Sequence, residues 1–169
     1  MVGWEKKWHE LYHELFQSSD YIRKKLSEFE FKENEYIAIH IRFVNALELA
    51  EPDFPQEPLN EVEKENLISS CIAKIQELEY TEGCKAVVFS DSNYFLSRCH
   101  DKNIFVLAGN VGHITYNQNA EFVLKMFSDL NMIARAKKVF SLRSNHLYAS
   151  AFPLYGSIIG GKLFNVVNL

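Results

Sequence analysis

Five short apolar runs alternate along this chain with longer segments of helical periodicity. The runs are short and rich in aliphatic or aromatic residues, which is typical of strands buried in a sheet. They lie at residues 35–42, 85–90, 103–107, 138–142 and 164–167. Strands that alternate with helices predict an α/β fold with right-handed crossovers. We therefore expect a Rossmann-like, doubly wound, mainly parallel sheet flanked by helices.

The intervening segments carry helix signals. Asn60 followed by Glu63 is typical of a capping box, and it opens a segment whose apolar residues form one stripe up to Leu78. Two helices are predicted within residues 1–34, the first over 4–16, and we expect this N-terminal segment to pack on the rest of the domain. The other predicted helices start at Asp91-Ser92-Asn93, span 119–135, and run from Arg143 to Phe152 near Pro153.

Composition limits the class of protein. With 169 residues, of which 47% are hydrophobic, the chain can bury one core, so we expect a single domain over 1–169. A net charge of −4 without a basic stripe argues against nucleic acid as a partner. No apolar run has the length of a membrane span. Three cysteines without close pairs indicate reduced thiols and a cytoplasmic location: Cys71, Cys84 and Cys99.

The first predicted strand delivers two polar side chains at its carboxyl end. It reads Tyr36-Ile37-Ala38-Ile39-His40-Ile41-Arg42 and is followed by a proline-containing loop. Ligands of open α/β sheets bind outside the carboxyl ends of the strands, and an arginine there can form paired, charge-assisted hydrogen bonds to a diphosphate. The alternative is a surface arginine beside a core histidine. The strand indicates a phosphate site only if other strand ends converge on it.

Three further strand ends carry polar groups. Ser90-Asp91-Ser92 follows the second strand, the loop from Gly109 to His113 follows the third, and Ser144-Asn145 follows the fourth. We expect all of them at one rim of the sheet. The predicted helix that opens at Ser144-Asn145 suits a phosphate, because its free amides and its dipole favour negative charge. Ordinary helix capping is the alternative for the serines and the asparagine.

Two motifs suggest other chemistry. His9-Glu10-Leu11-Tyr12-His13 has the H-E-x-x-H spacing of zinc proteases, but only eight residues precede it, so a packing helix is the favoured interpretation. The glycines of Gly156–Lys162 match the start of a phosphate-binding P-loop, but Leu163 replaces the magnesium-binding Ser or Thr. We expect these glycines to turn the chain between the last helix and the last strand.

The order of motifs resembles a known family. The segments "WHELYHELFQSS", "YIAIHIRF", "VVFSDSNYFL", "GNVGHI", "KMFSDLNMIARAKKVFSL" and "SNHLYASAFP" together resemble the C-terminal, nucleotide-sugar-binding half of fucosyltransferases of the GT-B architecture. The resemblance runs over most of the chain. Many family members continue the H-x-R motif with Arg-Gly-Asp, whereas this chain has Phe43-Val44-Asn45.

The resemblance implies a site for GDP-fucose as the donor. It places His40 and Arg42 at the diphosphate, with Arg42 stabilising the charge that develops on the leaving group. It implies no metal requirement. The other donor-binding positions that it implies are Asn45, Ser90, Asp91, Ser92, His113, Asp129 as a supporting contact, Ser144 and Asn145.

The predicted function is therefore that of a fucosyltransferase domain. The acceptor is unidentified, and its activating base is expected either on a missing N-terminal acceptor domain or in the loop with Glu48, Glu51 and Asp53. Two alternatives stay open: a nucleotide- or sugar-binding module without catalysis, and, through His9 and His13, a zinc hydrolase.

Overall fold

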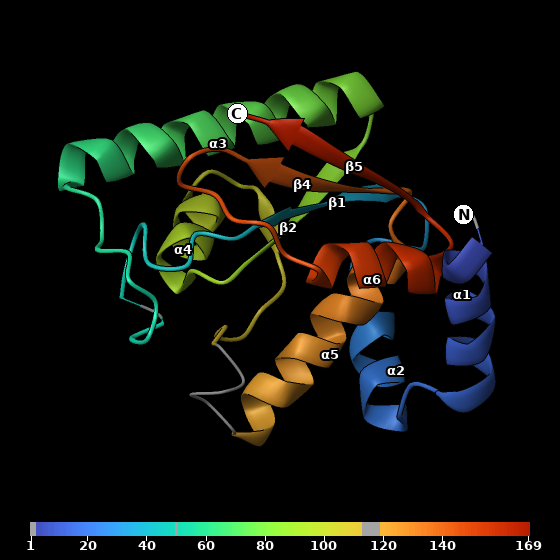
Figure 1. Ribbon diagram of the computed structural model, residues 1–169. Helices are drawn as coiled ribbons and strands as arrows, with labels where there is room; N and C mark the ends of the chain where they lie inside the picture. Colours follow the sequence, from blue (N-terminus) through green and yellow to red (C-terminus); the bar gives the residue numbers. More distant parts are fainter. Residues whose placement is uncertain (1–2, 50, 113–118) are drawn as a thin grey trace.

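Parallel strands form the centre of the computed structural model, which describes residues 3–49, 51–112 and 119–169 (Figure 1). Within these residues the sheet has five strands in the order β3-β2-β1-β4-β5, and all neighbouring pairs are parallel. The strands are β1 (Tyr36–Ile41), β2 (Lys85–Ser90), β3 (Phe105–Val106), β4 (Lys138–Arg143) and β5 (Leu163–Asn168). The predicted doubly wound α/β fold is confirmed.

Helices cover both faces of the sheet. In Figure 1, α3 lies across one face, and α5 and α6 lie on the other. The helices are α1 (Gly3–Leu15), α2 (Asp20–Ser27), α3 (Glu61–Glu82), α4 (Asn93–Asp101), α5 (Ala120–Arg135) and α6 (Phe152–Gly160). The capping box of α3 forms as expected, since the Asn60 side chain accepts from the Glu63 amide and the Glu63 carboxylate accepts from the Asn60 amide. None of the described helices is long and apolar enough to cross a membrane.

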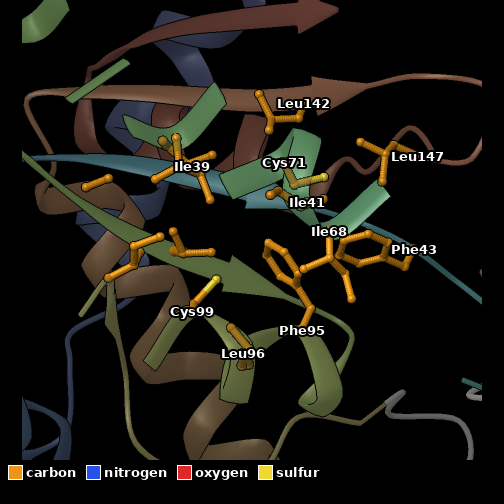
Figure 2. Packing of buried hydrophobic residues seen from close by; sticks show 14 of the residues in the cluster. Ile39, Ile41, Phe43, Ile68, Cys71, Phe95, Leu96, Cys99, Leu142 and Leu147 are labelled. Atoms are coloured by element: carbon orange, nitrogen blue, oxygen red, sulfur yellow. The ribbon is translucent and has the colours of Figure 1, made fainter. Parts of the chain in front are cut away.

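Alternation along β1 divides the core into two clusters. Ile37, Ile39 and Ile41 face α3 and α4, where Figure 2 shows Ile41 near Phe43, Ile68 and Phe95. The even-numbered residues Tyr36 and Ala38 face α5 and α6 instead. All six residues of β1 are buried, as expected for a central parallel strand. The same alternation places His40 and Arg42 on the side of α6.

The segment after β4 differs from the prediction. Ser144 forms a β-bridge with Leu147 rather than opening a helix, and the helix begins only at Phe152. The amide of Tyr148 donates to the carbonyl of Arg42, so this segment runs beside the end of β1 before α6 starts. The prediction of a helix from Arg143 to Phe152 is therefore wrong, because these backbone groups find partners in neighbouring strands and turns.

The glycine-rich segment also differs from the prediction. Gly156 and Gly160 lie inside α6, and only Gly161, with φ of 64°, turns the chain toward β5. A Cβ at Gly160 would lie 1.9 Å from the carbonyl oxygen of Ala134 in α5. These glycines are required for the close crossing of two helices rather than for a loop.

The N-terminal helices α1 and α2 contact the rest of the protein mainly through α6 and α5. The apolar side chains of α1 are largely exposed: Trp4, Trp8, Leu11 and Leu15 have relative exposures of 41–69%. Instead, His9 and His13 hydrogen bond the carbonyls of Ile158 and Ile159 at the end of α6. Helix α1 therefore packs on α6 through these hydrogen bonds and the contact of the Trp8 and Tyr155 rings, and α2 packs against α5 and the core.

Candidate functional site

A polar cavity of about 370 Å³ opens beyond the carboxyl ends of β1 and β2. This is the edge at which open α/β sheets bind ligands. Its lining residues come from the ends of both strands, from the following loops and from the segment before α6: His40, Arg42, Glu48, Leu49, Glu51, Asp91, Asn93, Val111, Gly112 and Ser150. The predicted convergence of His40, Arg42 and Asp91 at one rim is therefore present.

His40 is buried and uncharged. Its relative exposure is 7%, and its ring lies 5.9 Å from the ring of Phe152. Burial, together with the positive charges of Arg42 and Arg143, lowers the pKa of His40 to about 3. Its Nδ1 is buried and has no hydrogen-bond partner among the described residues. His40 lines the cavity, and a neutral imidazole can donate or accept a hydrogen bond there.

The guanidinium of Arg42 is half-covered by two carboxylates. Its Nη2 lies 2.8 Å from Oε1 of Glu51, and its Nε lies 4.0 Å from Oδ2 of Asp91. The side chain keeps 28% of its surface exposed to the cavity side and solvent. The Glu51 carboxylate therefore already occupies Nη2 of Arg42, a group that could otherwise bind an anionic ligand.

Asp91 connects the ends of β1 and β2. Its Oδ1 accepts from the Phe43 amide and its Oδ2 from the Val44 amide, both at 2.8 Å. Val44 has φ of 56°, which is strained for a β-branched residue. Burial raises the pKa of Asp91, and the amides of Phe43 and Val44 oppose that effect. Since Phe43 packs 4.8 Å from Phe95 in the core, both sides of this turn are anchored (Figure 2).

The loop after β1 is tied down by Asn45. This buried side chain accepts from the amide of Glu51 and donates to its carbonyl oxygen and to that of Phe54. A donor-binding role for Asn45 stays a prediction, because these contacts describe a residue that shapes the loop. Its effect is to hold the backbone of Glu51 beside Arg42.

The serines after β2 have capping roles. Ser92 accepts from the Phe95 amide and donates to Oε1 of Glu48, which also accepts from the Tyr94 amide. Ser90 accepts from the Ser92 amide. Thus the N-terminus of α4 is occupied by groups of the chain itself. Ligand contacts by Ser90 and Ser92 stay predictions.

Sequence reasoning missed two residues: Ser150, which lines the cavity, and Arg143, whose charge acts on His40. Ser150 lines the cavity and accepts from the Phe152 amide, at the start of α6. The N-cap residue of this helix, Ala151, has no side-chain group that could cap it. Arg143 ends β4 as Arg42 follows β1, and this repeated strand-end arginine was a usable signal. Ser150 was not recognisable because the helix start was misplaced.

Three further predicted positions, Ser144, Asn145 and Asp129, do not line the cavity. The described residues that line the cavity do not include Ser144 or Asn145, so their donor-binding role stays a prediction, as does that of Asp129. Asp129 forms a buried ion pair with Lys125 at 2.6 Å, and burial raises its pKa to about 6. His113 lies outside the described residues.

The two competing motifs have structural roles. His9 and His13 each use a ring nitrogen on a backbone carbonyl of α6, and no cluster of three or more metal ligands occurs in the described ranges. Lys162, the lysine of the P-loop-like segment, contacts Glu33 and Asn34 instead of the cavity.

Comparison with known proteins supports the fold. The chain is similar to NodZ alpha-1,6-fucosyltransferase soaked with GDP-fucose, with a TM-score of 0.57, 15% identity and coverage of 89% of this chain and 45% of that one. It is also similar to the same enzyme co-crystallized with GDP, with a TM-score of 0.54, 16% identity and coverage of 87% and 44%. The chain thus has a fucosyltransferase-like fold and spans less than half of these structures. No protein-family model and no curated protein matches it.

Proposed function

We propose that this chain is the donor-binding domain of a fucosyltransferase-like enzyme and binds GDP-fucose in the cavity above β1 and β2. The observation that carries the proposal is the pair His40 and Arg42 on one face of a central strand, both lining a polar cavity. The similar NodZ structures were determined with GDP-fucose and with GDP. We retain from the sequence the cytoplasmic location, for which three free thiols are the support.

In this proposal Arg42 binds the diphosphate and stabilises the charge that develops on it when the sugar leaves. His40, uncharged, exchanges a hydrogen bond with the donor through its imidazole ring. The start of α6 adds the Ser150 hydroxyl and the positive end of a helix dipole. No acceptor-activating base is assigned: Glu48 and Glu51 both line the cavity, but Glu48 accepts from Ser92 and the Tyr94 amide and Glu51 pairs with Arg42.

The test is GDP binding by isothermal titration calorimetry. We expect Arg42→Ala to weaken GDP binding roughly tenfold to a hundredfold, because a charge-assisted hydrogen bond contributes about 1.5–3 kcal/mol. Arg42→Lys should recover only part of the loss, since lysine lacks the paired geometry of the guanidinium. Arg98→Ala is the matched control, because Arg98 pairs with Glu65 between α3 and α4 and does not line the cavity.

GDP-fucose, GDP-mannose and UDP-glucose then separate the possible donors. Release or transfer of fucose that is lost in Arg42→Ala supports an enzyme, whereas GDP-fucose binding without turnover supports a binding module. Absence of GDP binding by the wild-type protein, or equal binding by Arg42→Ala, contradicts the proposal.

A further inference from the structure

The two carboxylates near Arg42, those of Asp91 and Glu51, differ in their other hydrogen-bond partners. Asp91 is bonded to two backbone amides of the turn that follows Arg42, whereas the Glu51 carboxylate has Arg42 as its hydrogen-bond partner among the described contacts. Asp91 therefore belongs to the framework of the strand end. Glu51 belongs to the loop after β1, it lines the cavity, and its side chain is 12% exposed.

We infer that these two residues have opposite effects on anion binding: Asp91 is a positioning residue that holds Arg42 in its binding geometry, and Glu51 is an internal competitor that occupies the guanidinium until a diphosphate displaces it. The inference rests on the proposed function and deepens it.

The role of Asp91 follows from backbone strain. Val44 needs a partner to keep a φ of 56°, and Asp91 supplies it by binding the amides of Phe43 and Val44 together. Successive amides that point at one carboxylate form an anion-binding nest. Asparagine at this position has the same shape, but its NH₂ group cannot accept the second amide. Loss of that bond frees the turn, and with it the Arg42 side chain.

The role of Glu51 follows from its geometry. Its carboxylate lies 2.8 Å from Nη2 of Arg42, the distance at which a phosphate oxygen would bind, and Asn45 fixes the Glu51 backbone in this position. A diphosphate must therefore replace an existing ion pair. Removal of the negative charge at Glu51 eliminates that competition.

The experiment compares GDP binding by three variants that each remove one negative charge. Simple electrostatics predicts tighter anion binding for all of them. We expect instead that Asp91→Asn weakens GDP binding about tenfold, because a misplaced binding group loses most of its interaction. We expect Glu51→Gln to strengthen it roughly fivefold, the size of a partly exposed ion pair. Glu57→Gln, an exposed residue of the same loop, should leave it unchanged.

A readout specific to positioning is the preference for GDP over GMP. A general loss of structure would weaken both nucleotides, whereas displacement of Arg42 should lower this preference. Amide hydrogen exchange of Phe43 and Val44 in the free protein should accelerate in Asp91→Asn and stay unchanged in Glu51→Gln. If Asp91→Asn does not fold, rapid exchange of these two amides in the wild-type protein would overturn the positioning role, and slow exchange would support it.

Different results would contradict the roles of Asp91 and Glu51 and the proposed donor site. Affinity changes of the same sign in Asp91→Asn and Glu51→Gln, or no change in either, overturn the inference while leaving the donor site in place. If neither the wild-type protein nor Glu51→Gln binds GDP or inorganic pyrophosphate, the proposed function itself is wrong.

Discussion

The imidazole of His40 lies on the α6 face of the sheet, within the electric field of two guanidinium groups. Burial and the charges of Arg42 and Arg143 keep it neutral in the folded protein, with a pKa of about 3. In the unfolded chain a histidine has a pKa of about 6.5. Unfolding below that pH therefore takes up a proton, so acid favours the unfolded state.

We predict that His40 makes the protein less stable as the pH falls from about 6.5 toward 3. At pH 5 the loss amounts to about 2 kcal/mol, since one pKa unit corresponds to about 1.36 kcal/mol. Asp129, whose pKa is raised to about 6, acts in the opposite direction. Comparison of the wild-type protein with His40→Asn isolates the histidine. Urea unfolding at pH 5 and pH 7 should show a smaller decrease in the variant, and equal decreases would contradict the assignment.

Among the helices, α6 is the one whose position affects the site most. It begins at Phe152, whose amide donates to the cavity-lining Ser150, and it crosses α5 so closely that glycine is required at the contact. Near its C-terminal end, the carbonyls of Ile158 and Ile159 form hydrogen bonds with His9 and His13 of α1. The position of the start of α6 beside the cavity thus depends on the contact of Gly160 with α5 at the other end of the helix.

Gly160→Ala should destabilise the protein by about 3 kcal/mol or more, because the new methyl group would overlap the backbone of Ala134. Gly83→Ala is the matched control: it places alanine at a φ of 65° with nothing within 4 Å, and strain alone costs about 1 kcal/mol there. Urea denaturation measures both. A Gly160→Ala protein as stable as Gly83→Ala would show that α5 and α6 can separate without loss.

At the scale of the whole molecule, one parallel sheet covered on both faces supports a cavity built from segments far apart in sequence. Arg42 comes from the end of β1, Asp91 from the end of β2, and Ser150 from the approach to α6. A ligand bound there contacts all three segments, and it binds only when they are folded together. Its binding free energy therefore adds to the stability of the domain.

We predict that GDP at a hundred times its Kd raises the free energy of unfolding by about 2.7 kcal/mol. For a domain of this size the midpoint of thermal unfolding should rise by roughly 5–10 °C. Scanning calorimetry with and without GDP measures this shift. At the same GDP concentration Arg42→Ala should show a clearly smaller shift, whereas Arg98→Ala should match the wild-type protein. Equal shifts in all three proteins would place GDP outside the cavity.

Local patterns in the sequence determined most elements of this protein. The capping box of α3, the strands of the central sheet and the spacing of His40 and Arg42 depend on residues within a few positions of one another, and all were predictable. The short β3 is an exception, since only Phe105–Val106 pair with β2 where five residues were expected. Edge strands pair on one side only, so their length depends on a neighbour rather than on their own residues.

The tertiary structure alone decided how the site is completed. Asp91 reaches amides 47 and 48 residues away, and the helix that borders the cavity starts at Phe152 instead of Ser144 because Tyr148 bonds the end of β1. The pairing of Glu51 with Arg42 likewise depends on the path of a loop. Such contacts follow from how backbone hydrogen bonds are satisfied once the sheet is assembled, and no local pattern contains that information.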